Sequence, residues 1–325
     1  MALVKFAIPK GSIEDATFKV LERSWTKVRR RDRTYRVTLD DPQIQVKMLR
    51  PQEIPNLVFD GLYDVGITGK DWVQETKADV QTLLDLEFGK IKLVIAIPDS
   101  YSFRSFDDMI ATYAKKKKIL RISSEYLTTA ARFIKQCKSY KKLYGSKDPL
   151  IITPWLRIGS NKNVQIHLSF GATEAKPPDD VDAIMDVTET GTTLTQNQLK
   201  IVDTVMESTA VLIANKSSLK DKSKREKIYD IVTLLSDAVE GRKHLHIYLN
   251  VRAQNIDKLL RELPALKRPT ISPLSEKGWY GINTIIPKSE LYKLVPKLRK
   301  IAQGLVVHEP RQILSLEEIK RDEEN

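Results

Sequence analysis

Short apolar runs alternate with segments of helical periodicity along the first two thirds of the chain. Apolar runs bounded by turn residues predict buried strands, and the amphipathic segments between them predict helices. The predicted strands are residues 4–8, 46–49, 92–98, 120–123, 164–169 and 183–187. The predicted helices include residues 14–23, 54–59 and 128–136. This alternation favours an α/β fold with largely parallel sheets and covering helices.

The last third of the chain has a different rhythm. A polar, charged segment at residues 216–227 precedes a helix that is predicted at 228–240. Strand, helix, strand, strand, helix and strand then follow at residues 245–251, 256–263, 270–273, 279–286, 290–301 and 304–308. This βαββαβ order predicts a ferredoxin-like domain. Domains of this size often bind regulatory ligands, although the fold alone does not establish that role.

A turn rich in hydroxyl side chains follows the apolar strand at residues 183–187. Gly191 allows the backbone to approach an anion, and a helix predicted at 194–201 would direct its N–H groups toward it. Carboxylates at Asp186 and Glu189 precede the turn, where they can bind sugar hydroxyls or a divalent cation. The hydroxyl donors of the turn are Thr190, Thr192 and Thr193. The pattern leaves two interpretations open, a phosphate cradle and a well-capped turn that binds nothing.

Composition narrows the class of protein. The 325 residues exceed the usual size of a single core, which favours two or three domains. A hydrophobic fraction of 41% and a charged fraction of 30% are typical of a globular protein in water. The single cysteine excludes an internal disulfide and fits a reducing compartment. No signal peptide and no segment of membrane-spanning length is recognised, so a cytoplasmic protein without membrane attachment is expected.

The formal net charge of +12 predicts acidic partners, either nucleic acid or phosphorylated small molecules. Much of the excess lies at residues 29–33, 115–118 and 216–227. Each of these runs is equally consistent with a solvated surface. No helix-turn-helix, zinc-finger spacing or aromatic-interleaved basic strand accompanies them, and the expectation is therefore no nucleic-acid partner.

Seven segments in order give the chain a specific resemblance. It resembles ATP phosphoribosyltransferase of histidine biosynthesis, in the long form with a C-terminal regulatory domain. Each segment is weak alone, but their order and spacing cover nearly the whole chain. The segments are Ile8-Pro9-Lys10-Gly11, residues 49–55, residues 64–71, Phe88-Gly89-Lys90, Gly171-Ala172-Thr173-Glu174, residues 182–194 and residues 269–274 with Gly278-Trp279.

The resemblance implies a reaction and a fold. Members of the family join ATP to 5-phosphoribosyl-1-pyrophosphate, giving N1-(5-phosphoribosyl)-ATP and pyrophosphate, with Mg²⁺ as the cofactor. Two α/β lobes of the periplasmic-binding-protein type (type II) would hold the site, and the ferredoxin-like, ACT-like domain would bind histidine as a feedback inhibitor. A homo-oligomer, from dimer to hexamer, is expected.

The corresponding domain limits are set by the predicted elements. The first catalytic lobe is expected at residues 1–97 with 190–225, and the second at 98–189, with the phosphoribosyl pyrophosphate loop at its end. A connecting helix at 226–243, a regulatory domain at 244–315 and a tail at 316–325 complete the division.

The resemblance also assigns roles to individual residues. Asp186, Glu189 and Lys10 are expected to be catalytic. Asn250 and Thr270 are expected to bind regulatory histidine. Mg²⁺ is expected to be held mainly by substrate phosphates, so that no protein metal ligand is predicted. The residues expected to bind phosphoribosyl pyrophosphate or ATP are Gly11, Arg50, Gly69, Lys70, Glu174, Thr190, Gly191, Thr192 and Thr193.

One departure from the family pattern concerns charge. The family usually continues the opening motif with arginine, where this chain has Ser12. Arg50 or Lys70 is the candidate that replaces the missing cation. Two other classes of protein remain as alternatives: a cytoplasmic solute-sensing protein of the same fold without catalysis, and a basic nucleic-acid-associated protein with a sensing domain.

Overall fold

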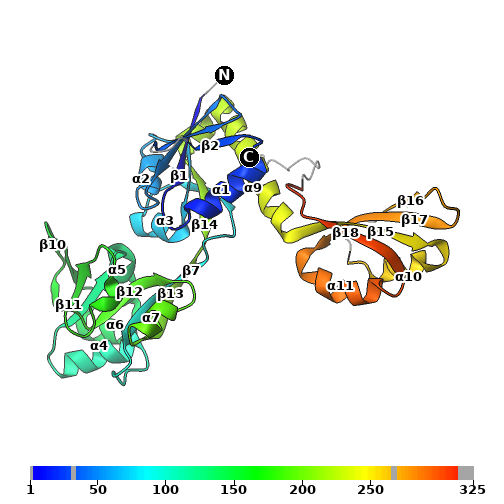
Figure 1. Cartoon of the computed structure of the whole chain (residues 1–325). Coiled ribbons are helices and arrows are strands. Elements are labelled where there is room, and N and C mark those ends of the chain that lie inside the picture. The colour runs from blue at the N-terminus through cyan, green and yellow to red at the C-terminus, as the bar shows by residue number, and fades with distance from the viewer. Residues whose placement is uncertain (1–2, 31–33, 265–268, 314–325) are drawn as a thin grey trace. The chain divides into compact units, whose positions relative to one another are not determined.

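The structure is a computed structural model that describes residues 3–30, 34–264 and 269–313 (Figure 1). These residues form two compact units. One unit consists of Lys5–Glu14 and Lys47–Asp221, and it holds most of a first sheet and all of a second. The other unit includes Asp15–Val46 and the chain from Lys222 onward, and it holds a third, four-stranded sheet.

The first sheet has seven strands in the order β2-β3-β4-β1-β5-β14-β6. Strand β1 is parallel to β5, and β14 is antiparallel to both β5 and β6. Apolar side chains of α2, β1 and β14 pack together as one buried cluster. The elements are β1 (Val4–Pro9), α1 (Glu14–Ser24), β2 (Val28–Arg30), β3 (Arg36–Leu39), β4 (Ile44–Leu49), α2 (Ile54–Phe59), β5 (Val65–Gly69), α3 (Lys70–Thr76), β6 (Gln81–Asp85) and β14 (Ala210–Ala214).

The second sheet also has seven strands, in the order β10-β9-β11-β8-β12-β7-β13. Helices α4, α5 and α6 bury one face of it, and Leu194 of α7 packs on the opposite face. Both faces are therefore covered, which explains the nearly continuous apolar run of its strand β7. The elements are β7 (Ile91–Pro98), α4 (Phe106–Lys115), β8 (Leu120–Ser124), α5 (Leu127–Gln136), α6 (Lys138–Tyr144), β9 (Pro149–Ile152), β10 (Arg157–Ile158), β11 (Asn161–Leu168), β12 (Ala183–Thr188), α7 (Thr192–Gln196) and β13 (Leu199–Ser208).

The chain crosses between these two sheets twice. It leaves the first sheet after β6 and returns to it between β13 and β14. Two α/β lobes joined by two crossings are the type II arrangement of periplasmic binding proteins. The predicted fold class is confirmed for these lobes.

The third sheet has the strand order β16-β17-β15-β18, and all its pairs are antiparallel. Side chains on β15 alternate, so that one face packs on α10 and α11 and the other is uncovered by helices (Figure 1). This confirms the predicted ferredoxin-like βαββαβ domain. Its elements, with the helix that precedes them, are α9 (Lys222–Lys243), β15 (His244–Arg252), α10 (Ile256–Glu262), β16 (Thr270–Pro273), β17 (Trp279–Pro287), α11 (Leu291–Leu298) and β18 (Ala302–His308).

After β18 the chain returns to the helices that precede the third sheet. The Arg311 guanidinium donates to the backbone carbonyl of Arg23 at 2.9 Å, at the end of α1. Gln312 donates to the carbonyl of Leu234 in α9 at 3.3 Å. A Cβ atom on Gly241 would lie 3.1 Å from the Arg311 carbonyl oxygen, so the close approach favours glycine there. The third sheet is therefore attached to α9 at both of its ends.

The predicted helix at residues 194–201 is wrong. Helix α7 ends at Gln196, Gln198 has a left-handed backbone with φ +58°, and β13 begins at Leu199. In so short a segment, the spacing of the apolar residues fits both the period of a helix and the period of a strand. Antiparallel pairing of β13 with β7 decides for a strand.

The sheets also bear on the expected lobe limits. Strands β7 and β13 lie in the second sheet, although the prediction placed residues up to 97 and from 190 in the first lobe. An apolar run does not reveal which of two sheets a strand joins. The five domain limits stay predictions, and the tail at 316–325 lies outside the described residues. No helix in the described ranges is both long and apolar enough to cross a membrane.

Candidate active site

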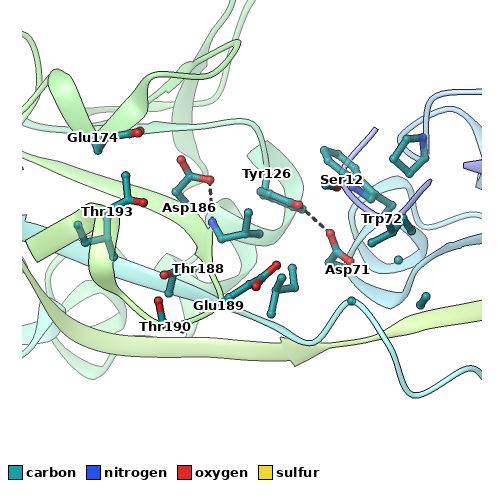
Figure 2. Close-up of a pocket in the computed structure, with 18 of the residues that line it drawn as sticks. Ser12, Asp71, Trp72, Tyr126, Glu174, Asp186, Thr188, Glu189, Thr190 and Thr193 are labelled. Atoms are coloured by element: carbon teal, nitrogen blue, oxygen red, sulfur yellow. Dashed lines mark hydrogen bonds between the residues drawn. The ribbon is translucent and has the colours of Figure 1, made fainter. Parts of the chain in front are cut away.

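A cavity of ≈ 540 Å³ lies in the unit that carries the first two sheets, and residues of both lobes line it (Figure 2). Ser12 contributes from the turn after β1, and Tyr126 from the residue before α5. The end of β12, the turn after it and the start of α7 together supply the largest group of lining residues. Its members are Asp186, Val187, Thr188, Glu189, Thr190, Thr192, Thr193 and Leu194.

Hydrogen bonds within this turn fix its shape. The N–H of Gly191 donates to the Thr188 hydroxyl at 2.8 Å, and the hydroxyls of Thr190 and Thr192 lie 2.8 Å apart. Gly191 has φ +83°, a left-handed conformation that glycine adopts without strain. Helix α7 begins at the next residue. The turn thus presents threonine hydroxyls to the cavity at the start of a short helix.

Asp186 carries the most perturbed carboxylate of the cavity. Its Oδ1 accepts the N–H of Val187 at 2.7 Å, and its Oδ2 accepts the hydroxyl of Thr173. Burial is the chief cause that raises the pKa of Asp186 to about 6; the Val187 N–H lowers it, and the charges of Glu125 and Glu174 raise it. A carboxylate so placed gains from a ligand that donates hydrogen bonds to it.

Asp71 lies across the cavity in a different network. Asp71 is 3% exposed, and its carboxylate accepts the Ser208 hydroxyl at 2.6 Å. It also accepts the Tyr126 hydroxyl at 2.7 Å (Figure 2). Tyr126 also stacks on Trp72, with ring centroids 4.5 Å apart and planes at 24°. A Cβ on Gly69 would lie 2.1 Å from Asp71 Oδ1, so the absence of a side chain at 69 makes room for this carboxylate.

The three predicted cations follow neighbouring strands of the first sheet. Lys10, Arg50 and Lys70 come directly after β1, β4 and β5, which are adjacent in the order β4-β1-β5. The N–H of Lys10 donates to the carbonyl of Leu49 at 2.7 Å, which brings the ends of β1 and β4 together. Arg50 Nη1 lies 3.5 Å from the position of a Cβ on Gly11. Open α/β sheets bind ligands at such strand ends.

The predicted site residues divide into two groups. Those that do not line the cavity are Lys10, Gly11, Arg50, Lys70 and Gly191. Those that line it are Gly69, Glu174, Asp186, Glu189, Thr190, Thr192 and Thr193.

Asn250 and Thr270 lie in the third sheet, on the face opposite the core. Asn250 pairs with Gly281, and Thr270 pairs with Asn283 two residues further along β17. The Oδ1 atom of Asn250 is buried and has no hydrogen-bond partner among the described residues. A buried carbonyl oxygen without a donor favours binding of a ligand that supplies one.

Several residues that line the cavity were not among the predicted site residues; Asp71, Trp72, Tyr126 and Thr188 are examples. Thr188 carried a signal, because it belongs to the same hydroxyl-rich turn. Tyr126 carried none, because it reaches Asp71 across 55 residues of sequence. In the part of the chain that the structure describes, no three His, Cys, Asp or Glu side chains are grouped so as to hold a metal ion.

The fold and the cavity define a two-lobed α/β protein with a site for a small, polar ligand, followed by a separate ferredoxin-like domain. Residues 50–237 match the family model described as "ATP phosphoribosyltransferase", and residues 241–309 match "HisG, C-terminal domain". The chain belongs to the ATP phosphoribosyltransferase family.

Relatives and a solved structure agree with this membership. The ATP phosphoribosyltransferase of Solibacter usitatus is 38% identical over 95% of this chain and 98% of its own length. That of Pelodictyon phaeoclathratiforme is 34% identical over 93% of this chain and 95% of its own. A solved structure, "ATP phosphoribosyl transferase (HisG:HisZ) complex from Thermotoga maritima", matches with a TM-score of 0.55 at 22% identity, over 73% of this chain and 99% of that one, and shows a shared fold.

These findings confirm the predicted family, the class of enzyme (a pentosyltransferase) and the place in histidine biosynthesis. The alternative of a solute-sensing protein without catalysis is not favoured.

Proposed function

We propose that the chain transfers the phosphoribosyl group of phosphoribosyl pyrophosphate to N1 of ATP within the cavity, with release of pyrophosphate. The observation that carries this assignment is the hydroxyl-rich turn after β12, with Asp186 and Glu189 beside it in the cavity lining. Displacement at an anomeric carbon builds positive charge on the ribose ring and negative charge on the leaving group. Positioning and electrostatic stabilisation are therefore the main contributions of the protein.

The turn after β12 binds the 5-phosphate in this proposal. The hydroxyls of Thr190, Thr192 and Thr193 line the cavity, and a glycine at 191 keeps the backbone in the left-handed turn. Hydroxyl and N–H donors bind a phosphate without a metal or a lysine. Asp186 and Glu189 accept the ribose hydroxyls, which places the anomeric carbon for attack.

Mg²⁺ fits the donor set of the cavity. Magnesium takes oxygen ligands, and one or two carboxylates are enough when substrate phosphates supply the rest. Glu189 lines the cavity at the proposed sugar site and would supply such a carboxylate. When bound, the ion neutralises charge on the departing pyrophosphate.

Lys10, Arg50 and Lys70 bind the pyrophosphate or triphosphate oxygens in the proposal. Arg50 is the best candidate to replace the family arginine, whose position is occupied by Ser12 in this chain. The guanidinium of Arg50 lies beside Gly11, and the adjacent Ser12 lines the cavity. A planar guanidinium binds two phosphate oxygens at once. Arg50→Gln is expected to raise the KM for phosphoribosyl pyrophosphate, and adding Ser12→Arg to that variant is expected to restore part of the affinity. Absence of any rescue would count against this replacement.

The reaction itself is tested by mixing the protein with ATP, Mg²⁺ and phosphoribosyl pyrophosphate and following the absorbance of the adduct. Gly191→Val tests the turn, because a β-branched side chain is strained at positive φ. Gly145 offers a matched control: its φ is +62° and a Cβ there would meet nothing within 4 Å. Gly191→Val is expected to abolish phosphoribosyl pyrophosphate binding, whereas Gly145→Val retains it. Equal affinities in the two variants would remove the assignment of the turn.

Feedback inhibition by histidine is proposed for the third sheet. Asn250 and Thr270 lie on its uncovered face, and the unpartnered Oδ1 of Asn250 is suited to accept from an amino group. His246 of β15 pairs with His308 of β18, so the two ends of the segment 246–308 lie side by side. This segment can be excised and replaced by a short glycine linker, which keeps the hydrogen bond of Arg311 to α1. The excised protein should lose histidine sensitivity and keep activity; persistent inhibition would refute the assignment.

The remaining proposals concern assembly and location. The family membership supports the proposal of a homo-oligomer, from dimer to hexamer, in the cytoplasm. Light scattering of the purified chain, with and without histidine, tests the oligomeric state.

A further inference from the structure

The loop between β11 and β12 carries Glu174, which lines the cavity, and Thr173 and Lys176, which do not; the Thr173 hydroxyl donates to Asp186. We propose that Lys176 is a positioning residue: it ties this loop to the end of β8, and the loop in turn fixes the Asp186 carboxylate through Thr173. The inference rests on the proposed role of Asp186 in binding ribose hydroxyls.

Lys176 has unusual partners for a lysine. Its Nζ donates to the Ser169 hydroxyl at 2.6 Å and to the Ser123 hydroxyl at 3.3 Å. Both serines are buried, with 1% and 0% of their surface exposed. In the described part of the chain Lys176 forms no ion pair. The ammonium group therefore serves to join two buried hydroxyls, one at the start of the loop and one on β8.

The loop between these anchors is closed by its own hydrogen bonds. The N–H of Ser169 donates to the Ser124 carbonyl at 3.1 Å, and the N–H of Lys176 donates to the Thr173 carbonyl at 3.1 Å. Gly171 and Ala172 both have left-handed backbones, with φ +90° and +49°. A left-handed alanine raises the conformational free energy of the loop. The hydrogen bonds at the two ends of the loop therefore have to stabilise this change of chain direction.

This change of chain direction places Thr173 beside Asp186. Thr173 is 1% exposed, and its hydroxyl donates to Asp186 Oδ2 while the Val187 N–H donates to Oδ1. Two donors on different oxygens fix the plane of the carboxylate and leave its remaining lone pairs for a ligand. Glu174, the next residue, lines the cavity. Lys176 thus acts on the site through Thr173, at the far end of one turn.

A pH profile separates positioning from a merely structural role. A hydroxyl that donates to a carboxylate favours its charged form, so removal of that donor raises the pKa of Asp186 further above its usual range. Because the carboxylate form accepts the ribose hydroxyls, the acidic limb of kcat/KM moves to higher pH when the donor is lost. Loosening the fold elsewhere does not move this limb.

The experiment uses the full chain and compares Thr173→Val, Thr173→Ser and Lys176→Met. Thr173→Val is nearly isosteric and lacks the donor, whereas Thr173→Ser keeps it. Loss of a hydrogen bond to a charged group predicts a fall in kcat/KM of roughly tenfold to a hundredfold for Thr173→Val, with the acidic limb shifted upward and both effects recovered in Thr173→Ser. Lys176→Met is expected to show the same shift with a smaller fall.

The double variant Thr173→Val/Lys176→Met is expected to lose no more than Thr173→Val alone, because both changes act through one contact. Lys135→Met is the matched control, since Lys135 pairs with Asp148 on an exposed surface, and it should leave the limb in place. Additive losses, or an unmoved limb in Lys176→Met, would overturn the inference. Asp186→Asn distinguishes the two levels: full activity in that variant would instead remove the proposed role of Asp186.

Discussion

Asp71 and Asp186 line the same cavity with opposite surroundings. Asp71 is almost fully buried, and hydroxyls of Ser208 and Tyr126 occupy both of its oxygens. Asp186 lies near two further carboxylates, and its pKa is raised to about 6, chiefly by burial. Each carboxylate accepts one donor on each oxygen, but the charge of Asp186 is also disfavoured by burial and by the neighbouring charges of Glu125 and Glu174.

This difference separates a structural carboxylate from a binding one. A buried charge that the protein fully satisfies stabilises the fold around it and has little to gain from a ligand. A carboxylate with a raised pKa costs folding free energy that a ligand with hydroxyl donors can offset. We therefore interpret Asp71 as a structural carboxylate of the cavity wall, whereas the proposed function places the binding of ribose hydroxyls on Asp186.

The largest effect is expected from Asp186→Asn. Loss of the charge that faces the ribose ring should lower kcat/KM by about a hundredfold or more. The folded pKa of about 6 exceeds the usual value of 3.8, so burying the charge penalises the folded state above pH 6 and the penalty disappears as the pH falls from 6 toward 3.8. The variant should therefore be more stable than the parent at pH 8, by roughly 1–3 kcal/mol, and equally stable near pH 4. Denaturant unfolding at the two pH values measures this; lower stability at pH 8 would contradict it.

The next effect concerns Gly69 and Asp71. Gly69→Ala places a Cβ within 2.1 Å of Asp71 Oδ1 and should lower the free energy of unfolding by about 1–3 kcal/mol through loss of the network. If Asp71 is structural, adding Asp71→Ala removes the clash, and the double variant should be no less stable than Asp71→Ala alone. Thermal melts of the three variants measure this, and strict additivity would break the comparison.

The pH dependence of the parent enzyme gives a third measure. Because the charged form of Asp186 is the one that accepts hydroxyls, kcat/KM for phosphoribosyl pyrophosphate should fall below a pKa of about 6. Asp71→Asn should leave this limb in place. A limb that followed Asp71 instead would reverse the two assignments.

The smallest effect is expected from Tyr126→Phe. The change removes one hydroxyl donor from Asp71 and keeps the aromatic stack on Trp72. A cost of about 1 kcal/mol in stability is expected, with kcat changed less than threefold. A large loss of activity without loss of stability would show that Tyr126 contacts substrate.

The two aspartates also show how far the sequence predicts the site. Asp186 belongs to one continuous segment of strand, turn and helix start, and local pattern is enough to single it out. The network of Asp71 joins residues 55 and 137 positions apart, and no local pattern encodes such contacts. Distant pairs of this kind depend on how the two lobes fold.

The sequence predicts the type and order of most helices and strands, and in two places it also predicts their limits. Residues 54–59 and 270–273 form a helix and a strand with the predicted limits, because apolar period and flanking prolines agree there. Residues 199–208 form a strand because β7 supplies a partner, whereas the seven-residue spacing of Leu194 and Ile201 alone fitted a helix as well. Tertiary pairing decided what local periodicity left ambiguous.

The return of the chain from β18 to α1 has a consequence for communication within its unit. The third sheet is connected to α9 through residues 243 and 244, and Arg311 links the following segment to the carbonyl of Arg23. A displacement of the third sheet therefore acts on α9 through the covalent connection at residues 243 and 244. It acts on α1 through the contact of the Arg311 guanidinium. If one of these two connections is removed, the other still transmits the displacement.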